Sequence, residues 1–208
     1  MSKPYNPFPV LPVIMPADLR NQVNGRLDEK LLKPVAEYPK GRLHWRAATA
    51  YSCMHFAALM DGITLTPTST VDCYRSYARQ EAAFNDRYSA TPTWRKPEVT
   101  RVWQGQTYWL KTGKAPSAVP GTSNHGWGLA VDIANASGKR LAWLMGTNAY
   151  TSKALLYGFT WEVASGPNAE PWHIRYVCGD NYTQAVKDLL KKVPELEVTR
   201  DGNGPNLP

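Results

Sequence analysis

The stretch that decides the fold is TSNHGWGLAVD, residues 122–132, read together with EPWH, residues 170–173. The first segment places His125 seven positions before Asp132, and the second places Glu170 three positions before His173. Two neutral imidazoles and one carboxylate form a common three-ligand zinc set, with a fourth position open for water. The remaining carboxylate is then free to accept that water's proton. The residue types therefore favour a hydrolytic zinc site, although their spacing alone does not decide it.

Both segments contain residues that allow the chain to turn. Gly126 and Gly128 let the backbone bend sharply and approach an ion closely. On a straight strand, Glu170 and His173 would point to opposite faces. Pro171 at the start of that strand is expected to break this geometry and to turn Glu170 back towards the metal.

Composition and charge allow several kinds of partner. The 208 residues suffice for one well-buried domain, and 43% hydrophobic with 20% charged residues is ordinary for a globular protein. The net charge of +7 favours a polyanion, which could be nucleic acid, an anionic membrane or a bacterial wall. Lys and Arg are spread along the whole chain, so charge alone selects none of these.

Cysteines and the first residues bear on the compartment. Three cysteines without a CxxC motif argue against a disulfide framework and suit a reducing compartment. Prolines interrupt the apolar stretch within residues 1–19, which therefore matches neither a signal peptide nor a membrane span. We expect synthesis in the host cytoplasm without a signal peptide, and delivery by another component if the substrate lies outside.

Periodicity and turn residues predict the organisation. We expect a Pro-rich N-terminal arm over residues 1–40, a peptidase domain over 41–195 and a tail or linker stub over 196–208. No second core is expected. The insertion at 89–120, with a β-hairpin at 99–111, is either a substrate-binding flap or a stabilising excursion. The expected helices span residues 44–61, 76–88, 138–157 and 183–192, and the expected strands span 63–66, 69–74, 129–134, 158–163 and 171–177.

Three motifs together resemble a known family. They are S-x-H-x-x-G-x-A-x-D at residues 123–132, EPWHIRY at 170–176 and DCYRSYARQ at 72–80. The set resembles the zinc D-alanyl-D-alanine carboxypeptidase family, which includes vancomycin-resistance carboxypeptidases and dipeptidases and the L-alanyl-D-glutamate peptidase endolysins of bacteriophages. The motifs occur in the family's order and cover roughly residues 45–177.

The resemblance implies a role for each motif residue. It implies that His125, Asp132 and His173 hold Zn²⁺. Glu170 would be the general base, which takes the proton of the zinc-activated water and later protonates the leaving amine.

Further positions follow from the upstream motif and from Ser123. Arg75 matches the arginine that steadies the substrate's carbonyl oxygen as charge develops. The alternative for Arg75 is a structural ion pair with Asp72 or Glu81. Ser123 and Gln80 match positions that contact the peptide substrate.

These observations predict an α+β fold in which a small antiparallel sheet carries the zinc site and helices flank it. The predicted function is hydrolysis of peptidoglycan stem peptides at a bond involving a D-amino acid, in a bacteriophage endolysin that acts at the bacterial cell wall. Alternatives are a host D,D- or L,D-carboxypeptidase and a non-catalytic wall-binding or phage tail-associated protein, although a binder would not need Glu170. We expect a monomer without nucleic-acid binding or stable membrane association.

Overall fold

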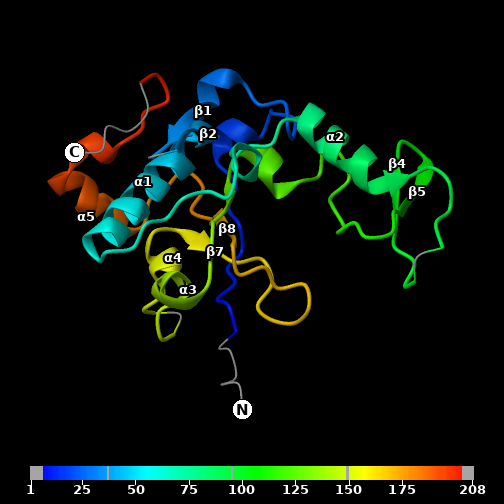
Figure 1. Ribbon diagram of the computed structural model, residues 1–208. Coiled ribbons are helices and arrows are strands. Elements are labelled where there is room, and N and C mark those ends of the chain that lie inside the picture. Colours follow the sequence, from blue (N-terminus) through cyan, green and yellow to red (C-terminus); the bar gives the residue numbers. More distant parts are fainter. Residues whose placement is uncertain (1–6, 37, 95, 149, 203–208) are drawn as a thin grey trace, which may run out of the picture.

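The structure is a computed structural model, and it describes residues 7–36, 38–94, 96–148 and 150–202. The first residues of the expected arm and the last of the expected tail lie outside these ranges. The chain forms a mixed helix and strand fold with three small antiparallel sheets and one long central helix, α1 (Trp45–Met60) (Figure 1). This arrangement confirms the predicted α+β class.

Helix α1 is the centre of the main core. Side chains on every face of it are buried, among them Ala47, Tyr51 and Met54, and a helix that is covered all round belongs in an interior. The backbone N–H of Asp61 closes the last turn, and Gly62 follows with φ +70°. The helix predicted over 44–61 is therefore confirmed to within one residue at each end. No helix in the described ranges combines the length and the apolarity needed to cross a bilayer.

The sheet that carries the candidate site lies beside α1. Its strands β6 (Ala130–Asp132), β7 (Phe159–Thr160) and β8 (His173–Tyr176) are antiparallel in the order β6-β8-β7. The register places Asp132 directly opposite His173. The predicted strands at 129–134, 158–163 and 171–177 are all present in shorter form. Helices α3 (Gly138–Met145), α4 (Lys153–Leu156) and α5 (Gln184–Lys192) surround this core.

Both ends of the described chain join the same core. The hairpin of β1 (Leu32–Val35) and β2 (Tyr38–His44) packs on α1, and the preceding segment contains the short turns η1 (Ala17–Leu19) and η2 (Glu29–Leu31). Beyond η5 (Pro194–Leu196), Val198 is fully buried, and its carbonyl accepts a hydrogen bond from Thr49. The core thus extends past both expected domain limits, residues 41 and 195.

Residues 77–121 form a separate lobe, here called the insertion lobe, which projects to one side of the core (Figure 1). It comprises α2 (Tyr77–Arg87), β3 (Tyr88–Ser89), β4 (Thr100–Trp103) and β5 (Gln106–Leu110), with strand order β3-β5-β4. The predicted α2 helix and 99–111 hairpin are confirmed. The expectation of a single core is wrong, because Phe84, Tyr88 and Leu110 form a small core of their own.

Three predictions of secondary structure are also wrong. Residues 63–66 and 69–74 form no strand, and the second segment contains the 3₁₀ turn η3 (Thr70–Asp72). Next to β6, the chain forms only short pairing: an isolated bridge joins Pro67 to Ile133, and the Thr68 N–H donates to the Asp132 carbonyl at 2.8 Å, but Pro67 has no N–H to extend a ladder. The helix predicted over 138–157 is split between α3 and α4, because Gly146 adopts φ +64° and a Cβ there would lie 2.4 Å from the Thr151 carbonyl oxygen.

Candidate metal centre

His125, Asp132 and His173 converge at one end of the β6–β8 strand pair. His125 lies in the 3₁₀ turn η4 (Asn124–Trp127), Asp132 ends β6, and His173 begins β8. One donor atom from each lies within 4.8 Å of the other two. Asp132 Oδ1 is 2.7 Å from His173 Nδ1 and 3.4 Å from His125 Nε2. The structure therefore brings together the three residues that the motifs imply as ligands.

Two glycines allow the first motif to make this turn. Gly128 ends η4 with φ +65°, and a Cβ there would lie 2.8 Å from the backbone nitrogen of His44. A Cβ on Gly126 would lie 2.0 Å from Asn24 Oδ1. Any side chain at either position would therefore push η4, and His125 with it, away from the strand that bears Asp132.

A turn before β8 brings Glu170 to the same place. The backbone N–H of His173 donates to the Glu170 carbonyl at 3.1 Å, and Trp161 Nε1 donates to the Pro171 carbonyl at 3.1 Å. Residues 171 and 172 form the turn itself. The chain is not yet extended here, so the alternation of side chains along a strand does not force Glu170 and His173 to opposite faces. Both residues line one cavity. This is the effect expected of Pro171.

The cavity over the three residues is open to solvent and has a volume of about 440 Å³. Its lining combines Asp132, Glu162, Glu170 and the two histidines with three arginines. Two of these arginines, Arg87 and Arg101, belong to the insertion lobe. The residues that line the cavity are Asp72, Arg75, Arg87, Arg101, Ala115, Pro116, Ser117, Ala118, Thr122, Ser123, Asn124, His125, Asp132, Glu162, Glu170, Trp172 and His173.

The electrostatics of the cluster suit a cation. Burial disfavours the charged form of Asp132, but hydrogen bonds from His125 and His173 outweigh it and hold the pKa of the carboxyl well below its usual range. Burial likewise lowers the pKa of His173, but its contacts to Asp132 and Glu162 are stronger and raise it to about 9. The carboxylates that hold a proton on His173 would also attract a divalent cation. This set of nitrogen and oxygen donors, nearly buried yet facing an open cavity, fits zinc.

Of the other predicted site residues, Arg75 and Ser123 line the cavity and Gln80 does not. Arg75 Nη2 pairs with Asp72 Oδ1 at 2.9 Å, so the predicted structural ion pair is present at the cavity wall. Gln80 is only 3% exposed. Its amide donates to Asn24 Oδ1 and accepts from the Gly121 backbone N–H, which places it behind the cavity. Gln80 therefore holds together the loops that shape the site.

Of the two tryptophans beside the ligands and the other two histidines, only one residue lines the cavity. Trp172 is 42% exposed and lines the cavity, whereas Trp127 packs against the main core. His44 and His55 are buried away from the cluster, on Asp18 and on the Leu65 carbonyl respectively. The three cysteines are free.

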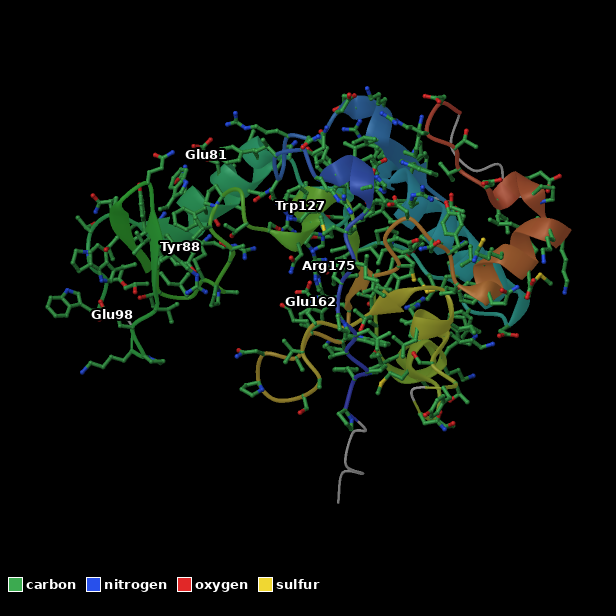
Figure 2. The ribbon with its side chains drawn as sticks, turned by 180° about the vertical axis from the view of Figure 1, so that it is seen from behind. Glu81, Tyr88, Glu98, Trp127, Glu162 and Arg175 are labelled. Carbon is green, nitrogen blue, oxygen red and sulfur yellow. The ribbon has the colours of Figure 1, made fainter. Side chains whose placement is uncertain are left out.

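Sequence reasoning missed Glu162, Asn124 and Arg175. Asn124 Nδ2 donates to Glu162 Oε2 at 2.6 Å, and Arg175 Nη1 donates to both Asn124 Oδ1 at 2.9 Å and Glu162 Oε1 at 3.3 Å. Figure 2 shows Glu162 and Arg175 close together near the middle of the molecule. A charged residue within the apolar segment GFTWEV was the signal available, because a buried carboxylate is costly unless it has a partner.

Two comparisons of the sequence with known proteins found relatives. A profile of the VanY D-alanyl-D-alanine carboxypeptidase family matches residues 40–179, more than half of the chain. The YodJ protein of Bacillus subtilis (strain 168), whose own assignment as a carboxypeptidase is provisional, is 31% identical over 153 residues. That alignment covers 68% of this chain and 48% of YodJ, so the chain spans about half the length of this curated relative.

Three solved structures are also similar. A zinc-bound variant of the vancomycin-resistance D,D-pentapeptidase VanY is 23% identical with a TM-score of 0.44, covering 81% of this chain and 86% of that one. VanYB in complex with D-alanine-D-alanine is 21% identical with a TM-score of 0.45, covering 87% and 91%. The LdcB LD-carboxypeptidase is 20% identical with a TM-score of 0.42, covering 78% and 80%. By the profile match, this chain belongs to the VanY D-alanyl-D-alanine carboxypeptidase family.

Proposed function

We propose that the chain is a zinc-dependent peptidase that hydrolyses peptidoglycan stem peptides at a bond involving a D-amino acid. One observation carries the proposal: the three candidate ligands, a free carboxylate at Glu170 and a guanidinium at Arg75 all line one open cavity. Family membership supports the substrate class, because the family takes its name from D-alanyl-D-alanine.

In this proposal, His125, Asp132 and His173 hold the zinc ion. When bound, zinc supplies Lewis acidity, which polarises a carbonyl group and makes water more acidic. Glu170 lines the cavity and forms no ion pair with any residue that the structure describes, so its carboxylate is free to accept a proton from the attacking water. The same carboxyl group then returns that proton to the nitrogen of the leaving amine as the peptide bond breaks.

Arg75 is placed to stabilise charge on the substrate's carbonyl oxygen. Its Nε donates to the Val71 carbonyl at 3.0 Å, and its Nη2 pairs with Asp72, so the guanidinium is held at the cavity wall before substrate arrives. A donor fixed in advance stabilises developing charge without reorganisation cost at the moment of reaction. The ion pair with Asp72 thus holds the Arg75 guanidinium in position for its catalytic role, so the structural and the catalytic interpretations of Arg75 are compatible.

The biological role that we propose is that of a bacteriophage endolysin acting at the bacterial wall. The net charge of +7 suits a polyanionic wall, and the motif resemblance includes phage lysins. The nearest alternative is an enzyme of the host that trims stem peptides. A lytic enzyme added to wall preparations should lower their turbidity, whereas a trimming enzyme should release amino acids at constant turbidity.

The deciding experiment is digestion of purified peptidoglycan and of short stem peptides, with products identified by mass spectrometry. We expect product formation that a chelator abolishes and added zinc restores, and that Glu170→Ala lacks. Release of terminal D-Ala would make the enzyme a carboxypeptidase. A cut between L-Ala and D-Glu, or within a cross-link, would make it a lytic endopeptidase. No zinc-dependent product from any wall type would reject the enzymatic function and favour a non-catalytic wall-binding or tail-associated role.

A further inference from the structure

His173 lies between two carboxylates, and only one of them belongs to the candidate metal ligands. Its Nδ1 faces Asp132 at 2.7 Å, while its Nε2 faces Glu162 Oε2 at 3.6 Å. The strand register explains this placement. Asp132 pairs with His173 across β6 and β8, and extending the β7–β8 register beyond Thr160 places Glu162 across from His173 on the other side.

The far nitrogen of His173 requires an acceptor. If Nδ1 binds a metal it must be unprotonated, so the ring proton lies on Nε2. That nitrogen is buried, and it has no hydrogen-bond partner among the residues that the structure describes. A buried donor without an acceptor costs about 1–3 kcal/mol. The carboxylate that lies 3.6 Å away is the natural acceptor, reached by a small side-chain rotation or through one water.

Glu162 is itself held from two sides. Asn124 donates to its Oε2 at 2.6 Å, and Arg175 donates to its Oε1 at 3.3 Å. Arg175 also donates to Asn124 at 2.9 Å, which closes a three-membered network. Asn124 is the neighbour of His125 in η4, and Arg175 lies on the same face of β8 as His173. The network therefore connects the segments that carry both histidines.

We propose that Glu162 is a positioning residue of the metal centre, whose carboxylate accepts the Nε2 proton of His173 and keeps Nδ1 free and directed at the metal. This inference rests on the proposed zinc site. Partners of this kind fix the tautomer and orientation of ligating histidines, and their loss typically costs about 10–100-fold in metal affinity. His125 has an equivalent arrangement without a charge, because its Nδ1 faces the Cys73 carbonyl oxygen at 2.9 Å.

The test is the zinc affinity of the purified full chain, measured by competition with a chromophoric chelator. We expect Glu162→Gln to weaken binding about 10–100-fold and Glu162→Ala to weaken it at least as much. Glu98→Gln is the matched control, because Glu98 is exposed on the insertion lobe (Figure 2) and should leave affinity unchanged. The absorption spectrum of the cobalt-substituted protein should change in the Glu162 variants and not in the control.

Two further readouts separate positioning from general structural support. The melting temperature of the metal-free protein should change much less than the metal affinity, whereas a purely structural role predicts the reverse and would overturn the proposal. If Glu162→Ala fails to fold, Glu162→Gln and Asn124→Ala remain available. We expect Asn124→Ala to weaken zinc binding in the wild-type background and to add little to Glu162→Gln, because both act through one network.

The outcomes also distinguish this inference from the proposed function. Tight zinc binding by the wild-type chain, with Glu162→Gln within about twofold of it, would reject the role of Glu162 and leave the zinc peptidase standing. Absence of zinc binding by the wild-type chain would reject both. A zinc affinity that falls in Glu162→Gln and in Glu98→Gln alike would attribute the loss to net charge and would also overturn the proposal.

Discussion

The metal centre and the insertion lobe face one cavity but are built differently. At the metal centre, side chains reach the cavity from a strand pair in the main core, and His125 and His173 are each less than 10% exposed. The insertion lobe contributes Arg87 and Arg101 from a sheet with a small core of its own. The groups proposed for chemistry and these two arginines therefore rest on different cores, and substitutions should affect them separately.

Replacing the proposed base should produce the largest effect and should be confined to chemistry. Glu170→Gln keeps the shape of the side chain and removes its ability to accept a proton. General acid–base catalysis contributes about 10²–10⁴-fold, so we expect kcat to fall by that factor with zinc content unchanged. Steady-state kinetics and metal analysis on one preparation check this. A retained kcat would show that another group accepts the proton, and Glu162, which lines the same cavity, would be the first candidate.

Arg75→Ala should reduce kcat/KM by about 10²–10³-fold, because one charge-stabilising donor is lost from the cavity wall. Its ion pair with Asp72 is partly exposed, so the contribution of that pair to folding is small. The measurement compares Arg75→Ala with Asp72→Asn, which loosens the guanidinium without removing it. If the two variants lost melting temperature to the same extent and activity to the same extent, Arg75 would have a structural role only.

The difference between the metal centre and the insertion lobe also explains which features could be predicted from the sequence. The helix predicted over 76–88 begins at Ser76, whose hydroxyl accepts from the Arg79 N–H three residues on, and such capping signals are local. The core of the insertion lobe was missed because Phe84 and Leu110 come from segments that meet only after the chain has folded.

The register between strands was the other feature that could not be predicted from the sequence. Glu162 and His173 are eleven positions apart and face each other only in the alignment of β7 with β8. Motif spacing identified Asp132 on one side of His173, but no short motif contains the residue on its other side. Long-range pairing, and not residue type, therefore separated the residues that were found from those that were missed.

A substitution in the small core should damage the insertion lobe and spare the metal centre. Phe84 is fully buried and stacks on Tyr88 with ring centroids 4.6 Å apart. Phe84→Ala typically costs about 3–5 kcal/mol in such a position. Hydrogen exchange should show lost protection in residues 77–110 and unchanged protection in β6 and β8, with zinc affinity retained. Loss of zinc binding together with lobe structure would show that the two cores fold as one unit.

The smallest effect expected is on substrate binding through the insertion lobe. Arg101 lines the cavity, and among the described residues its Nη1 donates only to the neighbouring Thr100 carbonyl, at 3.0 Å, so the guanidinium remains available to a carboxylate of the substrate. We expect Arg101→Ala to raise KM by about tenfold, the equivalent of 1.4 kcal/mol, with kcat unchanged. Lys187→Ala, which removes the same charge from an exposed position on α5, is the control.

The decisive form of this measurement compares stem peptides whose side-chain carboxyl groups are free or amidated. If Arg101 binds a carboxylate, its removal should affect the free peptide and leave the amidated one nearly unchanged, because the amide carries no charge. Equal effects on both peptides would mean that Arg101 acts through the shape of the lobe. A fall in kcat with constant KM would place Arg101 among the residues acting on the transition state, and the division of labour between the two cores would then no longer hold.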